Sequence, residues 1–235
     1  MKKILITRRL LKLSEDKASK IFDVKLNSND ELYSKTKLIE LSKGCDGILT
    51  SITDKIDEET INKLPNTVKI ISNFAVGFGN IDISAAKKKN IVITNTPDVL
   101  TDATAEIAML ILLGAARRAK EAVEWANKKN WKWSADFLMG KQLTGSRLGI
   151  LGMGRIGRAV AKRAKAFGMK IHYHNRSKLN QDLEAGATYH DNIQSLFSIS
   201  DILSINCPAT KETRKIINKK TLEFFSKETI ITNSA

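Results

Sequence analysis

Residues 148–177 read LGILGMGRIGRAVAKRAKAFGMKIHYHNRS and decide the fold of the second half of this 235-residue chain. An apolar run at 148–151 is followed by three closely spaced glycines, and a helix-forming segment then leads into a second apolar run at 170–174. The pattern predicts a strand, a tight turn, a helix and a second strand, which together form a βαβ unit. We expect the inner face of the helix to carry Ala159, Val160, Ala164 and Phe167.

Each glycine of this stretch has a separate physical task. Gly152 permits the tight turn, Gly154 lets the backbone approach a pyrophosphate, and Gly157 allows the helix to pack closely on the strand. The helix N-terminus then offers free N–H groups and a positive dipole end to an anion. The stretch therefore predicts a nucleotide-binding unit, and the alternative is a glycine-rich turn without a ligand.

The residues after the second strand indicate which cofactor is preferred. Units that bind NAD usually place an acidic residue about 20 positions beyond the first glycine, where it binds the ribose hydroxyls. This chain has Asn175, Arg176 and Ser177 there, so Arg176 can pair with the 2′-phosphate of NADP and its two neighbours can donate to the phosphate oxygens. We therefore expect NADPH to be preferred, with NAD as the alternative. In the simpler reading, Arg176 is only a solvated charge.

Composition excludes several classes of protein. No apolar run approaches the roughly 20 residues of a membrane span, and the start MKKILITRR lacks the apolar region of a signal peptide, so we expect a cytoplasmic protein without membrane contacts. The formal charge of +14 is spread along the chain without a nucleic-acid motif, so no nucleic-acid partner is expected. Cys45 and Cys207 lie far apart without a CxxC pattern, which argues against a disulfide framework or a metal site.

The first hundred residues alternate between strand-like and helix-like segments. Strands are expected at 3–7, 47–50, 68–74 and 91–94, and such alternation favours a parallel α/β sheet. A long helix is expected over 101–126, so we place the domain boundary near Val99. Trp125, Trp131 and Trp133 follow in a polar stretch, which indicates either a contact surface or burial under a local loop.

Further strands are expected at 201–206 and 229–233, with a weaker one near 187–190. The fold class is therefore α/β, with two doubly wound parallel-sheet (Rossmann-like) domains at 1–99 and 100–235. The second domain is expected to be incomplete at its C-terminus, because a dinucleotide fold has two βαβαβ halves and the chain stops at the end of a strand. We interpret the sequence as C-terminally truncated.

Several segments resemble the D-isomer-specific 2-hydroxyacid dehydrogenases, most closely their glyoxylate/hydroxypyruvate reductase branch. They cover almost the whole chain and read TSITDKID at 50–57, SNFAVGFGNID at 72–82, NTPDVLTDATAEIAMLILLGAARR at 95–118, CPATKETRKIIN at 207–218 and TNSA at 232–235. The resemblance implies a substrate-binding (catalytic) domain and an NAD(P)-binding domain around a cleft, and a homodimer.

The resemblance also assigns the substrate-binding residues. It implies that the backbone amides of Val76 and Gly77 hold the carboxylate of a small 2-oxo acid, and that Ser51 and Ile52 belong to a first substrate loop. Gly77 and Gly79 agree with this assignment, because a loop with two glycines can turn its N–H groups inward as an anion nest. The alternative for this loop is a plain tight turn.

For the cofactor, the resemblance implies contacts along the whole second domain. It places Met153, Gly154, Arg155 and Ile156 on the pyrophosphate, Asn175, Arg176 and Ser177 on the 2′-phosphate, Thr104, Ser234 and Ala235 near the nicotinamide, and Cys207, Pro208 and Thr213 along the loop that crosses the cofactor. Thr104 could equally be a helix residue that bonds its own backbone, and Thr213 a helix-entry cap.

The catalytic arginine, glutamate and histidine of the family match no residue of this chain. His172 and His174 are expected to lie on alternate faces of one strand, and neither they nor His190 are expected to relay protons. The predicted function is NADPH-dependent reduction of glyoxylate or hydroxypyruvate to the D-2-hydroxy acid, with residues 1–235 alone inactive. The alternatives are another 2-hydroxyacid dehydrogenase, such as a phosphoglycerate dehydrogenase, and a noncatalytic dinucleotide-sensing module.

Overall fold

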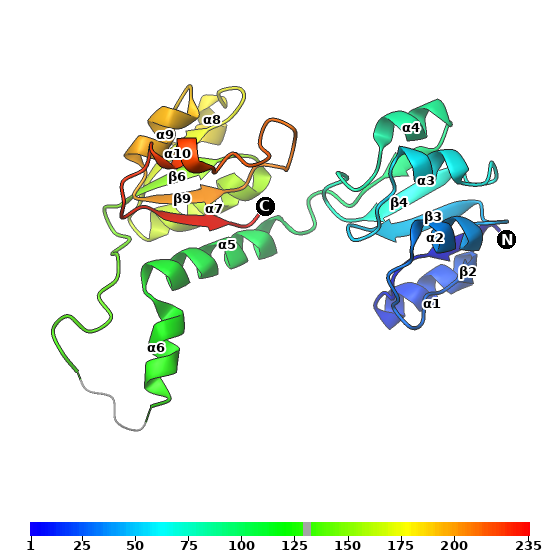
Figure 1. Cartoon of the computed structure of the whole chain (residues 1–235), viewed down its shortest axis with the longest axis horizontal. Coiled ribbons are helices and arrows are strands. Elements are labelled where there is room, and N and C mark those ends of the chain that lie inside the picture. The colour runs from blue at the N-terminus through cyan, green and yellow to red at the C-terminus, as the bar shows by residue number, and fades with distance from the viewer. Residues whose placement is uncertain (129–132) are drawn as a thin grey trace. The chain divides into compact units, whose positions relative to one another are not determined.

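The computed structural model in Figure 1 describes residues 1–128 and 133–235, and it consists of two compact units. The first unit comprises Met1–Val99 and the second comprises Leu100–Ala235. Each unit contains one five-stranded parallel sheet with helices packed against it. The two Rossmann-like α/β units expected from the sequence are thus confirmed as the fold class.

The sheet of the first unit has the strand order β2-β1-β3-β4-β5. Its strands are β1 (Lys3–Ile6), β2 (Asp23–Lys25), β3 (Gly47–Ser51), β4 (Ile70–Phe74) and β5 (Val92–Thr94). Its helices are α1 (Lys12–Ile21), α2 (Lys35–Leu41), α3 (Glu58–Lys63) and α4 (Ile83–Lys88). This order occurs in open α/β sheets that bind ligands beyond the carboxyl ends of their strands.

Polar side chains set where three helices of the first unit begin. Ser34, Asp57 and Asp82 are the N-cap residues of α2, α3 and α4, and the side chain of each accepts a hydrogen bond from a backbone N–H in the first turn. Buried aliphatic residues of β1, β3 and β4, including Leu5, Ile48 and Ile71, form the core beneath these helices.

The sheet of the second unit has the order β10-β9-β6-β7-β8. Its strands are β6 (Arg147–Leu151), β7 (Lys170–His174), β8 (Thr188–Tyr189), β9 (Ile202–Ile205) and β10 (Ile230–Asn233). Its helices are α5 (Thr101–Ala116), α6 (Ala119–Ala126), α7 (Arg155–Ala166), α8 (Gln181–Glu184), α9 (Ile193–Ile199) and α10 (Lys219–Leu222). Numbered within the unit, the order is the 3-2-1-4-5 of dinucleotide-binding folds, without a sixth strand among the described residues.

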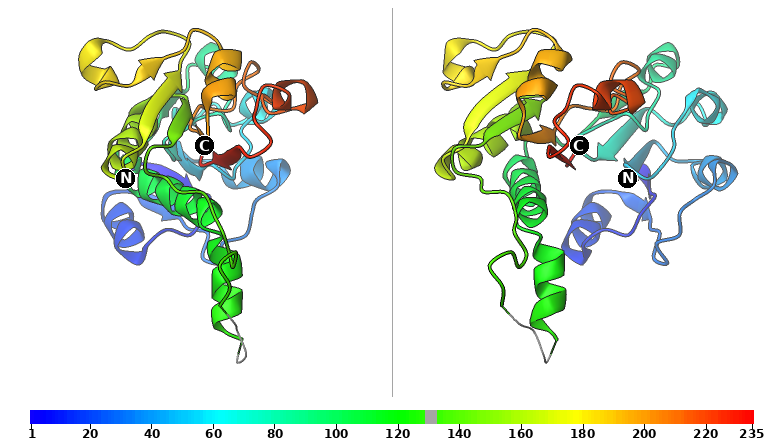
Figure 2. Two further views of the ribbon diagram at one scale, coloured as in Figure 1. Left: turned by 90° about the vertical axis from the view of Figure 1, so that its left-hand side faces the viewer. Right: turned by 60° about the vertical axis from the view of Figure 1, so that its left-hand side comes forward.

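Helices cover both faces of this second sheet (Figure 2). Leu148 and Ile150 of β6 belong to a core cluster with α5 and α7, whereas Leu151 belongs to a separate cluster with α9. Because side chains alternate between the faces of a strand, one apolar strand supplies both clusters. The stretch 148–177 therefore lies at the centre of the unit.

The structure corrects the single helix expected over 101–126. The chain forms two helices, because Arg118 adopts the left-handed conformation with φ 52° and α6 begins after it. The carbonyl of Ala116 accepts a hydrogen bond of 2.8 Å from the N–H of Lys141, a partner from outside the helix. This tertiary contact ends α5 where the local sequence would permit it to continue.

Two further expectations change. Phe167 is the C-cap residue of α7 and is 43% exposed, so it does not belong to the inner face, whereas Val160 and Ala164 are buried there. The short strand β2 was not expected, since its sequence DVK carries charges at both ends. It is an edge strand that pairs only with β1, and charged side chains are common at such edges.

Two of the tryptophans differ in environment, since Trp125 is partly buried and Trp133 is exposed. The rings of Trp125 and Phe137 meet edge to face with centroids 5.4 Å apart, and the Lys128 ammonium lies 4.1 Å from the Trp125 ring centroid. Trp133 is 76% exposed. Trp131 lies outside the described residues.

Candidate functional site

The glycine loop between β6 and α7 is held in a conformation that only glycine accepts easily. Gly152 has φ +93°, and a Cβ atom there would lie 2.7 Å from the backbone nitrogen of Cys207. A Cβ at Gly157 would collide with the carbonyl oxygen of Gly152. These two glycines therefore let β6, α7 and the end of β9 approach one another.

Gly154 differs from Gly152 and Gly157 because a Cβ atom there would meet nothing within 4 Å. The residue is the N-cap of α7, and as a glycine it has no side chain that could cap the first turn of that helix. The 12-residue helix thus begins beside bare backbone with open space around it. This arrangement suits a phosphate group, which binds free helix N–H groups and the positive dipole end.

Asn175 ties the glycine loop to the end of β7. Its side-chain Oδ1 accepts a hydrogen bond of 2.7 Å from the N–H of Met153, so both groups are engaged within the protein. Arg176 and Ser177 follow on the exposed surface. They line the same cavity of about 500 Å³ as the glycine loop. Predicted cofactor residues around this cavity are Gly152, Met153, Gly154, Asn175, Arg176, Ser177, Cys207, Pro208 and Thr213.

Sequence reasoning missed two charged residues of this cavity, Arg158 and Glu212. Arg158 follows Gly154 by four residues, and residues four apart lie on the same face of a helix. This spacing could have indicated that Arg158 faces the cavity. A hydrogen bond from Thr210 lowers the pKa of Glu212, and the positive charge of Arg176 adds to that effect. Glu212 therefore offers Arg176 a negative partner when no phosphate is present.

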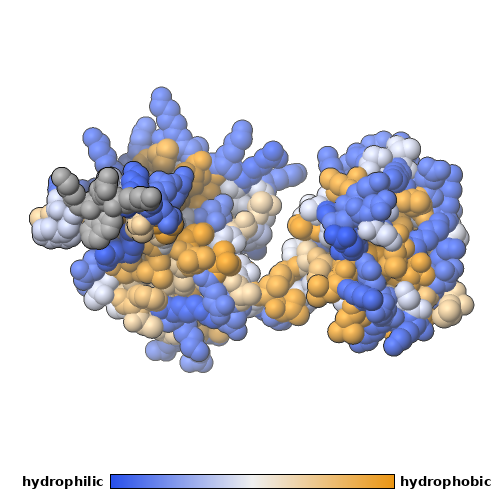
Figure 3. Space-filling view, turned by 90° about the horizontal axis from the view of Figure 1, so that it is seen from below, coloured by the Kyte–Doolittle hydropathy of each residue, from blue (hydrophilic) through white to orange (hydrophobic). Residues whose placement is uncertain are grey.

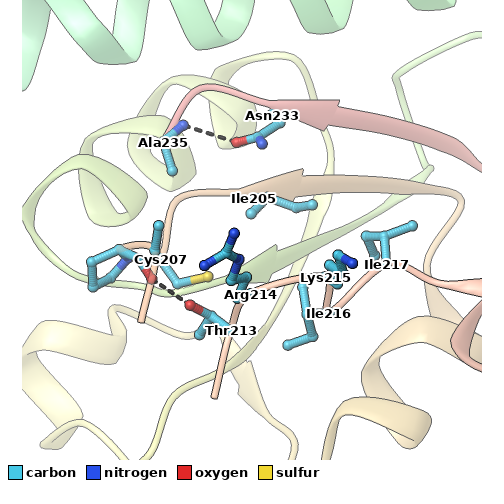
Figure 4. Close-up of a pocket in the computed structure, with 11 residues that line it drawn as sticks. Ile205, Cys207, Thr213, Arg214, Lys215, Ile216, Ile217, Asn233 and Ala235 are labelled. Carbon is cyan, nitrogen blue, oxygen red and sulfur yellow. Dashed lines mark hydrogen bonds between the residues drawn. The ribbon is translucent and has the colours of Figure 1, made fainter. Parts of the chain in front are cut away.

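A second cavity of about 320 Å³ lies beyond the ends of β9 and β10 (Figure 4). Cys207, Pro208, Thr213 and Ala235 line it, and the Thr213 hydroxyl donates to the Pro208 carbonyl at 2.6 Å. Burial raises the pKa of the Cys207 thiol, which keeps the thiol protonated near neutral pH. Thr213 thus closes its own loop and is not the helix-entry cap considered from the sequence, since the next helix, α10, has Asn218 as its N-cap residue.

The remaining predicted cofactor residues are not among those that line the two cavities. Arg155, Ile156 and Gly157 belong to the first turn of α7, and Thr104 lies on α5. The Ser234 hydroxyl donates a hydrogen bond of 3.1 Å to the Asn206 side chain.

The predicted substrate residues lie at the carboxyl edge of the first sheet, where β3 and β4 end. The N–H of Ser51 donates to Oδ2 of Asp54 at 2.8 Å, and Ile52 is 55% exposed. Asp54 is 2% exposed, and its Oδ1 has no hydrogen-bond partner within the part of the chain that the structure describes. Val76 and Gly77 lie on the exposed loop that follows β4.

The histidines do not alternate between faces as expected. His172 Nδ1 lies 3.0 Å from His190 Nε2, and His174 Nδ1 donates to the His190 carbonyl at 2.8 Å. That expectation was wrong because residues two apart on a strand share a face. Burial lowers the pKa of His172 and of His190, so both rings are neutral near pH 7.

The described residues contain neither a cluster of metal ligands nor a membrane-spanning helix. No group of three or more histidine, cysteine, aspartate or glutamate side chains in residues 1–128 and 133–235 could hold a metal ion. Each helix in those ranges is too short or too polar to cross a membrane.

The strand order, the glycine loop and the open N-terminus of α7 define a dinucleotide-binding α/β protein. Residues 109–235 match the model of the D-isomer specific 2-hydroxyacid dehydrogenase NAD binding domain. The chain is 39% identical to a glycerate dehydrogenase of Hyphomicrobium methylovorum, covering all of this chain and 74% of that protein. It is 40% identical to a glyoxylate reductase of Thermococcus litoralis, covering 99% and 72% respectively.

Solved structures agree with these relatives. The crystal structure of a glyoxylate reductase from Paecilomyes thermophila superposes with a TM-score of 0.83 at 34% identity, over 100% of this chain and 73% of that one. The chain belongs to the D-isomer specific 2-hydroxyacid dehydrogenase family, which confirms the resemblance found in the sequence.

Proposed function

We propose that this chain serves the NADPH-dependent reduction of a small 2-oxo acid, glyoxylate or hydroxypyruvate, to the D-2-hydroxy acid. Residues 1–99 form the substrate-binding domain, and residues 100–235 bind the cofactor. The observation that carries the cofactor assignment is Arg176, which lines one cavity with the glycine loop at the position where NAD-binding units place an acid. The relatives named glyoxylate reductase and glycerate dehydrogenase support the substrate class.

The described residues fit a phosphorylated dinucleotide. Gly154 leaves its backbone open to a pyrophosphate, and α7 begins directly after this glycine, which has no capping side chain. Arg176 and Ser177 supply a cation and a hydroxyl for the 2′-phosphate. A bound nicotinamide supplies the hydride that reduces the C2 carbonyl.

The other proposed contacts lie outside the glycine loop, in both units. Cys207, Pro208 and Thr213 border both cavities and form the loop that crosses the cofactor. Thr104, Ser234 and Ala235 complete the proposed nicotinamide end. In the first unit, the amides of Val76 and Gly77 bind the substrate carboxylate, while Ser51 and Ile52 border the substrate.

The Arg176→Asp substitution tests the cofactor assignment. It removes a charge-assisted hydrogen bond and places a carboxylate beside the 2′-phosphate, so NADPH affinity should fall by about tenfold or more while NADH affinity changes little. Fluorescence titration of both cofactors measures this difference. Lys162→Asp, at an exposed position of α7, makes the same charge change as a control. Equal losses for the two cofactors would contradict the assignment.

The proposal includes a homodimer. Ile107 and Leu110 on α5 and Val123 on α6 are 55%, 63% and 62% exposed, and Trp133 follows them on the surface. In Figure 3, apolar surface is interspersed with hydrophilic side chains on both units. Large apolar side chains that are exposed in a single chain can mark an interface between subunits. Sedimentation velocity should give the mass of two chains, and a single chain at micromolar concentration would exclude the homodimer.

A further inference from the structure

Three consecutive backbone carbonyls of the loop after β4, those of residues 75–77, accept hydrogen bonds from their own unit. The Ala75 carbonyl accepts from the Thr96 N–H at 3.0 Å. The side-chain amide of Asn95 donates to the Val76 carbonyl at 2.8 Å, and that of Asn73 donates to the Gly77 carbonyl at 2.8 Å. Each of these three consecutive peptide groups is therefore held in a fixed orientation.

The orientation of these peptides determines where their amides point. In a planar trans peptide the N–H of the next residue points opposite to the carbonyl. Because the three carbonyls are bonded toward Asn73, Asn95 and Thr96, the N–H groups that follow them are directed away from these partners. Within the described residues, the N–H groups of Val76, Gly77 and Phe78 donate no hydrogen bond. Free backbone amides in a loop can bind an anion such as a carboxylate.

The asparagines are themselves held in place. Asn73 is fully buried, and its side-chain amide and that of Asn80 bond reciprocally at 3.1 and 3.3 Å. Asn80 also donates to the carbonyls of Ser51 and Asp54 at 3.0 and 3.1 Å. One asparagine thus joins the two loops to which the proposed function assigns the substrate.

We infer that Asn73 and Asn95 are positioning residues, whose side-chain amides bond the Gly77 and Val76 carbonyls and so turn the N–H groups of Phe78 and Gly77 toward the substrate carboxylate. Asn80 holds Asn73 in place for this role, and the Thr96 N–H does for Val76 what the asparagines do for its two neighbours. This inference rests on the proposed function. It adds that the affinity for the carboxylate depends on neutral amide donors behind the loop, which never touch the substrate. Asn95 gives the cleanest test, because it reaches the loop through one side-chain bond and is not fully buried.

The experiment follows the backbone amides of the ¹⁵N-labelled chain by NMR while oxalate, a two-carbon dicarboxylate, is added. Oxalate should shift the amide signals of Val76, Gly77 and Phe78 in the unmodified chain. Asn95→Leu removes the donor at nearly constant volume and should weaken oxalate binding about fivefold. Asn95→Gln, which keeps an amide donor, should recover most of that loss.

Two controls separate this role from general destabilisation. Asn62→Leu makes the same chemical change at an exposed position of α3 and should leave oxalate binding unchanged. NADPH affinity and melting temperature should be the same in all variants. If Asn95→Leu binds oxalate as tightly as the unmodified chain, the inference is overturned and the proposed function stands. If oxalate shifts none of the three amides in the unmodified chain, the proposed carboxylate site and this inference both fail.

Discussion

Residues 1–235, mixed with NADPH and glyoxylate, should oxidise NADPH several orders of magnitude more slowly than a glyoxylate reductase relative does, while NADPH binding should remain measurable. Reduction of a carbonyl needs a proton donor near the oxygen and a cation for the developing charge, and each contributes about a hundredfold or more. The sequence contains three histidines, and all of them lie together at β7 and β8. His174 uses its Nδ1 proton on the His190 carbonyl, so it is poorly suited to act as the acid.

The absorbance of NADPH at steady state measures this rate. A glyoxylate reductase relative assayed under the same conditions provides the reference, and fluorescence titration shows that the cofactor is bound. Turnover comparable to that of the relative would mean that residues 1–235 contain a proton donor, and His174→Ala and His190→Ala would then locate it. The absence of turnover with NADPH binding intact also fits a dinucleotide-sensing module, whereas rapid turnover excludes it.

Gly154→Val should abolish tight cofactor binding without destabilising the fold. A Cβ atom at this position meets no protein atom within 4 Å, and the backbone φ of −75° is open to any residue. The new side chain would occupy the space that a pyrophosphate needs and would shield the first amides of α7. NADPH affinity should fall about a hundredfold, which corresponds to about 3 kcal/mol of binding free energy.

Calorimetric titration and thermal melting of the same samples separate the two effects. Gly79→Val, at a glycine of the first unit that also has open space around it, should change neither quantity. Gly157→Ala should lower the melting temperature as well as the affinity, because its Cβ collides with the Gly152 carbonyl. Unchanged NADPH binding in Gly154→Val would mean that the cofactor does not lie on the glycine loop.

The central βαβ unit could be predicted because its signal is local. Strand β6, helix α7 and strand β7 all follow from the alternation of apolar runs and glycines within thirty residues. The break between α5 and α6 could not be predicted, since it depends on the Lys141 N–H, which reaches Ala116 from a distant part of the chain. A tertiary hydrogen bond of this kind leaves no mark on helical periodicity.

The candidate site also contains residues that could be predicted from the sequence and residues that could not. Arg176 and the glycine loop lie around one cavity because adjacent parallel strands end at the same edge of the sheet. Glu212 approaches Arg176 from the loop after β9, and no sequence pattern specifies the path of that loop. Asn95 acts through a bond to a backbone carbonyl 19 residues away, so its residue type alone gave no indication of a role.

Parallel titration of the unmodified chain with NADPH and NADH tests the cofactor assignment, on which the proposed function depends. Because Arg176 and Ser177 can bind a 2′-phosphate and residues 175–177 include no acidic residue at the position where NAD-binding units place one, NADPH should bind about tenfold or more tightly than NADH. NADH binding as tightly as NADPH, or more tightly, would contradict the assignment.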